Sequence, residues 1–108
     1  MKRPAVIGLF ACGLLLVLAG TAQAAGDPAA GKQKNAMCIG CHGIEGYRTS
    51  YPTVYHVRRL GGQNAEYLVK ALQAYKSGAR NHPSMKGIAA SLSQQDMEDL
   101  AAYYAGTQ

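Results

Sequence analysis

Cysteine is scarce in this chain of 108 residues, which contains three: Cys12, Cys38 and Cys41. Cys12 lies in an apolar run near the N-terminus, so the remainder of the chain holds a single pair. A structural zinc site needs four ligands, and without a second cysteine pair only His56 and His82 remain to complete one. No cysteine is left for a disulfide between distant segments, and a disulfide between Cys38 and Cys41 is the alternative that stays open.

The chain also lacks several patterns that carry other functions. Basic residues outnumber acidic ones by 11 to 6, for a net charge of +5, but they are scattered along the sequence. Without a basic run interleaved with aromatic residues, binding to nucleic acid is not expected. There is no Ser/His/Asp arrangement, no paired carboxylates and no glycine-rich phosphate loop, so we do not expect an enzyme. No alternating strand pattern, repeat or heptad array is present, which favours an all-α fold.

Residues 1–24 have the features of a secretory signal peptide. These are a basic start at Lys2 and Arg3, an apolar run from Val6 to Ala19, and the small-x-small sequence Ala22-Gln23-Ala24. The apolar run is too short for a comfortable membrane span, and Cys12 lies inside it rather than at a lipoprotein cleavage site. We therefore expect cleavage after Ala24, export to the periplasm without a transmembrane anchor, and one domain over residues 25–108.

The two remaining cysteines belong to the sequence Cys38-Ile39-Gly40-Cys41-His42. This Cys-x-x-Cys-His pattern is the one at which haem is attached covalently as a c-type cofactor. Each thiol would add to one vinyl group of the porphyrin, and His42 follows closely enough to bind the iron from one face. A redox dithiol is the rival interpretation, but it needs a preceding strand and a βαβ context that this sequence lacks.

The motif therefore predicts one covalently bound haem c, with Cys38 and Cys41 forming the thioethers and His42 binding the iron. The chain left after cleavage is short for a protein with a single apolar core, and proteins of this size commonly need an additional stabilising group such as a disulfide or a bound metal. A haem is a large apolar plate that can complete such a core.

Capping signals predict three helices. Each begins after a short polar side chain: Asp27 before Pro28, then Asn64, then Ser93. The helices should span Pro28 to about Met37 or Cys38, residues 65–76 and residues 94–105. Gly78 should close the second helix in the left-handed conformation. Asp96 should form an acidic variant of the capping box with Ser93.

Residues 43–62 and 80–87 are predicted to be loops, because glycine and proline punctuate both segments. The first is long for a loop in a compact domain, which favours a functional role. We expect it to wrap the iron-ligating face of the haem. Leu60 and Tyr55 in this loop, and Tyr67 in the second helix, are the predicted haem-packing residues.

Met85 is the preferred sixth ligand of the iron. A thioether at this position is typical of electron-transfer sites, whereas an open position permits ligand binding or catalysis. Met85 lies in the second predicted loop, far enough along the chain from His42 to reach the opposite face of the haem. His82 is the main rival, and His56 is less favoured because it belongs to the segment expected beside His42. The other methionines are less suitable: Met1 is in the signal peptide, Met37 adjoins Cys38, and Met97 is on the core face of the third helix.

These residues together resemble a small monohaem class I c-type cytochrome of the bacterial periplasmic kind. The resemblance covers nearly all of the chain after the signal peptide. It rests on Gly31, Cys38 to Gly43, Leu60-Gly61-Gly62-Gln63, Tyr67-Leu68, Tyr75 to Arg80, Met85, Leu92-Ser93 and Leu100 to Tyr104. It implies an all-α cytochrome c-like fold, with three main helices and loops wrapped around one haem. It also implies that the first and last helices cross, with Gly31 facing Tyr103 or Tyr104.

The resemblance further implies axial ligation by His42 and Met85. The family often has a proline two residues before the leucine of Leu60-Gly61-Gly62-Gln63, and the carbonyl of that proline accepts a hydrogen bond from the ligand histidine. This chain has Arg58 at that position. Arginine offers the same carbonyl but not the rigidity of proline.

The expected function is the transfer of single electrons between redox partner proteins, a donor and an acceptor with acidic docking surfaces. Basic side chains suit such contacts. The candidates are Lys32, Lys34, Arg48, Arg58, Arg59 and Lys86. Two alternatives stay open: a haem subunit of a larger oxidoreductase, and a gas-binding or peroxidase-like haem protein with a labile sixth ligand.

Overall fold

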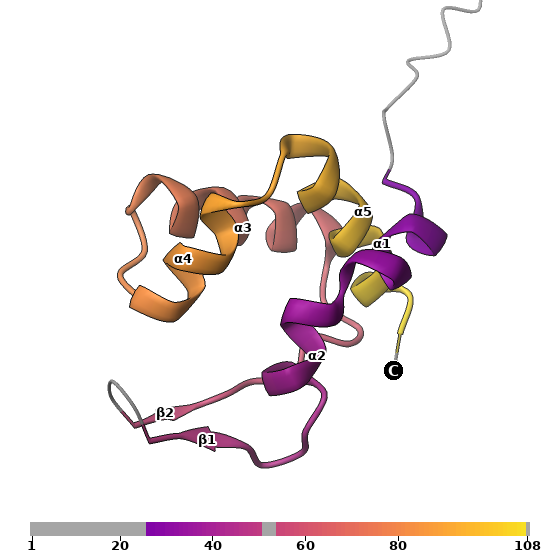
Figure 1. Cartoon of the computed structure of the whole chain (residues 1–108). Helices are drawn as coiled ribbons and strands as arrows, with labels where there is room; N and C mark the ends of the chain where they lie inside the picture. The colour runs from indigo at the N-terminus through magenta and orange to yellow at the C-terminus, as the bar shows by residue number, and fades with distance from the viewer. Residues whose placement is uncertain (1–25, 51–53, 108) are drawn as a thin grey trace, which may run out of the picture.

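The computed structural model describes residues 26–50 and 54–107, and the predicted signal peptide lies outside this part of the chain. Within it the fold is mainly helical. The helices are α1 (Pro28–Lys34), α2 (Ala36–His42), α3 (Ala65–Ser77), α4 (Pro83–Ala90) and α5 (Gln94–Ala105). None of the helices described there is both long and apolar enough to cross a membrane. The all-α prediction is confirmed, with two more helices in the described residues than the three expected (Figure 1).

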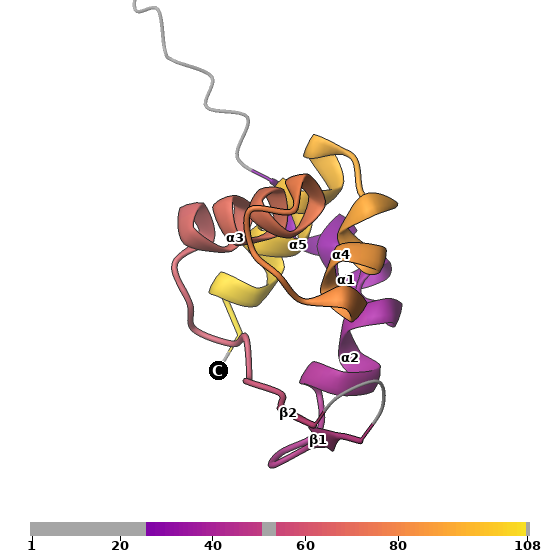
Figure 2. The same ribbon diagram turned by 90° about the vertical axis from the view of Figure 1, so that its left-hand side faces the viewer.

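A short antiparallel hairpin was not expected from the sequence. Strand β1 (Arg48–Thr49) pairs with β2 (Tyr55–His56), with Arg48 opposite His56 and Thr49 opposite Tyr55. Each strand has two residues, too few to produce a visible alternation of polar and apolar residues. The hairpin lies beyond the C-terminal end of α2, on the side away from α5 (Figures 1 and 2).

The first predicted helix is divided in two. Asp27 caps α1 as expected, accepting a hydrogen bond from the backbone of Ala29 at 2.9 Å. The helix ends at Asn35 (φ −81°, ψ 4°), and α2 then continues to His42 rather than ending near Cys38. Gly40 lies inside α2 and is tolerated there, because one glycine costs a helix only ~1 kcal/mol. The whole haem-attachment motif is therefore helical.

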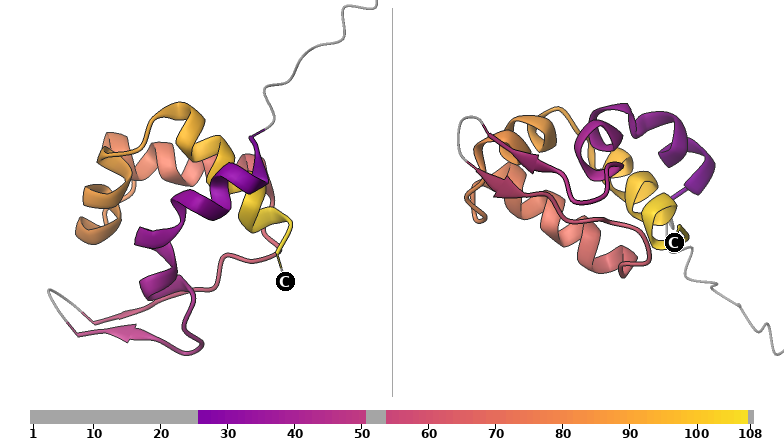
Figure 3. Two further views of the ribbon diagram at one scale, coloured as in Figure 1. Left: turned by 45° about the vertical axis from the view of Figure 1, so that its right-hand side comes forward. Right: turned by 90° about the horizontal axis from the view of Figure 1, so that it is seen from below.

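Helices α1 and α5 cross at Gly31, which is buried (Figure 3). A Cβ atom at Gly31 would overlap the backbone carbonyl of Asp99 and lie 2.8 Å from Cβ of Tyr103. Only glycine allows this approach, so the predicted contact between Gly31 and an aromatic residue of the last helix is confirmed at Tyr103.

A buried carboxylate strengthens the same crossing. Asp99 is 3% exposed and accepts hydrogen bonds from the Asp27 backbone (2.8 Å), Lys34 Nζ (2.6 Å) and Gln95 Nε2 (2.8 Å). Lys34 also pairs with Asp96 at 2.9 Å. The Lys34 ammonium is the main reason that the pKa of each of these two aspartates falls to about 2. We call Lys34, Asp96 and Asp99 the α1–α5 ion cluster.

Helices α3, α4 and α5 form the rest of the core, and the ends of α3 and α5 follow the sequence signals. The Asn64 side chain accepts from the Tyr67 backbone at 3.0 Å, and Gly78 closes α3 at φ 85°. Ser93 and Asp96 form the predicted capping box of α5. The buried apolar side chains are Leu68 of α3, Ala89 of α4, and Met97, Leu100 and Ala101 of α5.

The prediction of a loop over residues 80–87 is wrong from Pro83 onward, because α4 begins there. Proline is well tolerated at the first helical position, where a missing N–H costs nothing. Gly87 lies within the helix and is likewise tolerated. The cap is the side chain of His82, whose Nδ1 accepts from the Met85 backbone. Histidine is not among the usual capping residues, so the start of this helix carries no recognisable sequence signal.

Candidate haem-binding site

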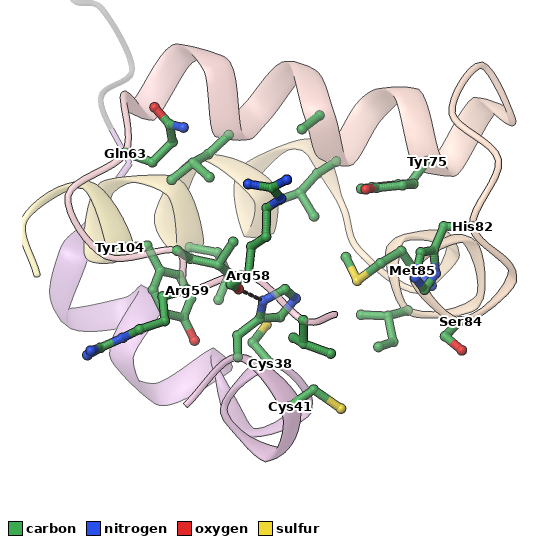
Figure 4. A pocket seen from close by; sticks show the side chains of 18 of the residues that line it. Cys38, Cys41, Arg58, Arg59, Gln63, Tyr75, His82, Ser84, Met85 and Tyr104 are labelled. Carbon is green, nitrogen blue, oxygen red and sulfur yellow. Dashed lines mark hydrogen bonds between the residues drawn. The ribbon is translucent and has the colours of Figure 1, made fainter. Parts of the chain in front are cut away.

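A cavity of about 320 Å³ lies between α2, the segment after β2, and helices α3, α4 and α5. Its walls are largely apolar, with Leu68, Ala71 and Leu72 from α3 and Leu100 and Ala101 from α5. Cys38, Cys41, His42 and Met85 all line this same cavity. The structure thus brings together side chains from two helices that are far apart in sequence (Figure 4).

Cys38 and Cys41 lie on α2, three residues apart. This spacing places two side chains on one helix face. Both are free thiols and both are partly buried. Burial raises the pKa of the Cys38 thiol, which keeps it protonated and apolar before any reaction. Within residues 26–50 and 54–107, no group of three or more His, Cys, Asp or Glu side chains is placed so that it could hold a metal ion.

The His42 ring is held by a backbone carbonyl. Its Nδ1 lies 2.5 Å from the carbonyl oxygen of Arg58, the bond drawn as a dashed line in Figure 4. A carbonyl can only accept, so Nδ1 must carry the proton. That tautomer leaves the lone pair on Nε2, the nitrogen available to a metal. The hydrogen bond implied by the family resemblance is therefore present although Arg58 replaces the proline.

Met85 approaches the cavity from the other side. It lies in the first turn of α4, and its sulfur points inward, across the cavity from Cys38 and Cys41 (Figure 4). His82, the rival ligand, also lines the cavity, but its Nδ1 accepts a hydrogen bond from the Met85 backbone at 3.2 Å. His56 belongs to the hairpin and is exposed, although it too lines the cavity.

The predicted packing residues are partly placed by the structure. Leu60 lines the cavity and is half-buried. Tyr67 lines it as well but is 51% exposed. The side chain of Tyr55 lies outside the described part of the structure.

Sequence reasoning missed Tyr104 as a member of this site. Its ring lines the cavity beside Cys38, and burial of the hydroxyl raises the pKa of Tyr104 to about 12. The signal was present, because Leu100, Ala101 and Tyr104 share one face of α5. A helical apolar stripe does not tell whether it faces another helix or a cofactor.

The residues present fit a haem c. Two thiols three residues apart stand at one wall, an imidazole has its metal-binding nitrogen unprotonated, and a thioether points in from the opposite wall. The walls between them are aliphatic and aromatic, as a porphyrin face requires. We therefore take this cavity as the candidate haem-binding site.

Comparison with known proteins agrees with this geometry. The family model for cytochrome c matches residues 28–107. Over 94 residues the chain is 43% identical to cytochrome c4 of Pseudomonas aeruginosa, covering 85% of this chain and 44% of that protein. It is 39% identical over 89 residues to cytochrome c-554(548) of Halomonas halodenitrificans, covering 78% of this chain and 100% of the relative.

A solved structure gives the same result for the fold. The crystal structure of reduced recombinant cytochrome c4 from Pseudomonas stutzeri superposes with a TM-score of 0.58 at 31% identity, over 77% of this chain and 50% of the other. The chain spans about half the length of the cytochrome c4 relatives it matches. The motif, the cavity and these matches agree that the chain belongs to the cytochrome c family, as a class I c-type cytochrome of bacterial kind whose covalently bound cofactor is haem c.

Proposed function

We propose that this protein transfers single electrons between redox partners through one haem c, attached at Cys38 and Cys41 and ligated by His42 and Met85. The observation that carries the proposal is that His42 lines the same cavity as Met85, whose sulfur points into it across from Cys38 and Cys41. If His42 and Met85 both held the iron of a bound haem, no coordination position would remain for a substrate, oxygen or peroxide. This favours a carrier over a gas-binding or peroxidase-like protein.

The bound haem supplies a one-electron couple between ferrous and ferric iron. The side chains around it are suited to that change because none of them has to gain or lose a proton. The His42 imidazole is fixed as a neutral ligand by the Arg58 carbonyl, and the Met85 thioether has no proton to exchange. The aliphatic walls from α3 and α5 carry no polar groups that would have to reorient when the charge changes.

Apolar side chains near the attachment motif support contact with a partner protein. Met37, Ile39 and Ile44 are 57%, 52% and 48% exposed. Exposed apolar side chains rimmed by polar ones are a common feature of protein interaction sites. Arg58 and Arg59 line the cavity and are exposed, and Arg48 is exposed on β1, which suits a partner with an acidic surface.

One of the basic residues predicted to contact a partner protein has another role in the structure. Lys34 is engaged in the α1–α5 ion cluster and is therefore less suitable as a docking residue. We infer that docking relies on the arginines beside the cavity. We further propose that residues 1–24 direct export to the periplasm, are cleaved after Ala24 and leave a single cytochrome domain over residues 25–108.

Optical spectra of the purified, exported protein test the proposal. Colour that stays with the denatured chain would demonstrate thioether attachment, and a reduced-minus-oxidised spectrum would report the haem type. The weak far-red ferric band of a sulfur–iron bond should be present in the wild type and absent in Met85→Ala. Met37→Ala is the matched control, because Met37 also lines the cavity but lies beside Cys38. Loss of the band is not expected there.

Two outcomes would contradict the proposal. If Met85→Ala keeps the band, Met85 is not the sixth ligand. If the wild-type ferrous protein binds carbon monoxide readily, the sixth position is open and a gas-binding role is favoured. Stable co-purification with a catalytic chain would instead favour a haem subunit of a larger oxidoreductase.

A further inference from the structure

We propose that His82 is a positioning residue for the distal ligand: its side chain caps the helix that carries Met85 and so holds the thioether toward the haem. This inference rests on the proposed function, because it takes Met85 as the sixth ligand. Nothing in the family pattern quoted above contains His82, and the sequence alone suggested only that it competes with Met85.

The cap acts on the ligand residue itself. His82 is in an extended conformation (φ −154°, ψ 104°) immediately before Pro83, the first residue of α4. Its Nδ1 accepts from the Met85 amide at 3.2 Å, and its carbonyl accepts from the Lys86 amide at 2.8 Å. Pro83 has no amide hydrogen, so these two bonds satisfy most of the donors of the first turn. The backbone of Met85 is therefore fixed by a side chain just outside the helix.

The His82 ring is in turn held by α3. Tyr75 packs against it edge to face, with ring centroids 6.1 Å apart and planes at 78° (Figure 4). Tyr75 also contacts Arg80, whose guanidinium lies 4.6 Å from the centre of the tyrosine ring. Helix α3 packs directly on α4, so the start of α4 is tied to a longer and better anchored helix. The backbone that carries the Met85 side chain therefore has little freedom to move.

Capping and iron binding are mutually exclusive for this ring. A neutral imidazole has one nitrogen with a lone pair and one that carries the proton. When Nδ1 accepts from the Met85 amide, the proton lies on Nε2, which then cannot bind a metal. For His82 to become a ligand through Nε2, it would have to give up the cap that orients Met85. The observed hydrogen bond therefore favours Met85 as ligand and gives His82 a different role.

The test uses variants of His82 in the haem-loaded protein. His82→Ala removes the cap, whereas His82→Asn keeps an oxygen at capping distance but no imidazole. Loss of an N-cap typically changes the underlying equilibrium about fivefold. We therefore expect the fraction of ferric protein without the sulfur–iron band to rise about fivefold in His82→Ala at a given temperature. His82→Asn should behave like the wild type, and so should the control His56→Ala, whose histidine also lines the cavity.

A second measurement reports the cap without the iron. Hydrogen exchange of the Met85 amide, followed by nuclear magnetic resonance in the diamagnetic ferrous protein, should be about fivefold faster in His82→Ala and nearly unchanged in His82→Asn. If His82→Ala yields no folded protein, His82→Gln replaces it. Glutamine carries the same amide group as asparagine but is not a preferred capping residue.

The outcomes separate this inference from the proposed function. A band and an amide exchange rate that are unchanged in His82→Ala would overturn the inference and leave the ligation by Met85 intact. Equal losses in His82→Asn and His82→Ala would also overturn it, because an oxygen at the capping position would then not replace the function of the imidazole. Retention of the band in Met85→Ala would contradict the proposed ligation, and the inference would fall with it.

Discussion

Replacing Gly31 with alanine should destabilise the haem-loaded protein through the crossing of α1 and α5. The added Cβ would overlap the Asp99 carbonyl oxygen, lie 2.6 Å from its carbon and lie 2.8 Å from Cβ of Tyr103. Comfortable carbon–carbon contacts are about 3.5–4.0 Å, so the helices must separate by about 1 Å. That movement would also stretch the bonds of Asp99 to the Asp27 backbone and to Lys34, which are 2.8 and 2.6 Å long.

The size of the effect follows from two opposing contributions. Overpacking a close contact costs about 1–3 kcal/mol, and the stretched hydrogen bonds favour the upper end of that range. Alanine is the better helix former by about 1 kcal/mol, which offsets part of the loss. We expect a net decrease of about 2 kcal/mol in the free energy of unfolding. For a domain of this size, that corresponds to a fall in Tm of about 8–16 °C.

Gly87→Ala provides the matched control. Gly87 also lies within a helix, but a Cβ atom there would have no heavy atom within 4 Å. The same substitution should therefore raise stability by about 0.5–1 kcal/mol. Thermal unfolding followed by circular dichroism at 222 nm would give both values. Equal shifts for the two variants, or a Gly31→Ala protein as stable as the wild type, would refute the close approach of α1 and α5.

Two further predictions concern charge and the proximal hydrogen bond. Because Lys34 lowers the pKa of both Asp96 and Asp99 from 3.8 to about 2, the ion cluster stabilises the fold above pH 4 and this contribution is lost as the pH falls toward 2. Lys34→Met should therefore move the acid unfolding transition, followed by circular dichroism, to higher pH, and an unchanged midpoint would contradict the pairing. Arg58→Ala should keep the visible haem spectrum and its ferric sulfur–iron band, because His42 bonds to the backbone carbonyl of residue 58 and not to the guanidinium. A change in that band would show that the arginine side chain is needed.

The parts of the fold that depend on local chemistry were predictable from sequence. The helix caps lie where expected, because each cap acts on amide or carbonyl groups within three residues of itself. These caps are Asp27, Asn64, Gly78 and the pair Ser93 and Asp96. The same locality explains the motif residues Cys38, Cys41 and His42, whose spacing alone places them on one wall.

The features that depend on tertiary contacts were not predictable. Helix α4 was not predicted, because Pro83 and Gly87 are typical of loops. Its cap is a histidine held by Tyr75 of α3, and this contact between helices is not visible in the sequence. The role of Tyr104 at the cavity depends on which helix face meets the cofactor, and the spacing of apolar residues in α5 is equally consistent with either partner. The resemblance to c-type cytochromes supplied what spacing could not, namely the carbonyl of Arg58 beside His42.

The crossing at Gly31 joins segments that are far apart in the sequence, so α1 is synthesised well before α5. Asp99 holds the backbone at Asp27, so the element leading into the attachment motif is oriented by a residue 72 positions further along the chain. We expect a chain truncated before α5 to leave α1, the helix that leads into α2, without its packing partner. Maturation of the cofactor site should then wait until α5 has been made, so the order of assembly depends on topology and not on the position of the motif in the sequence.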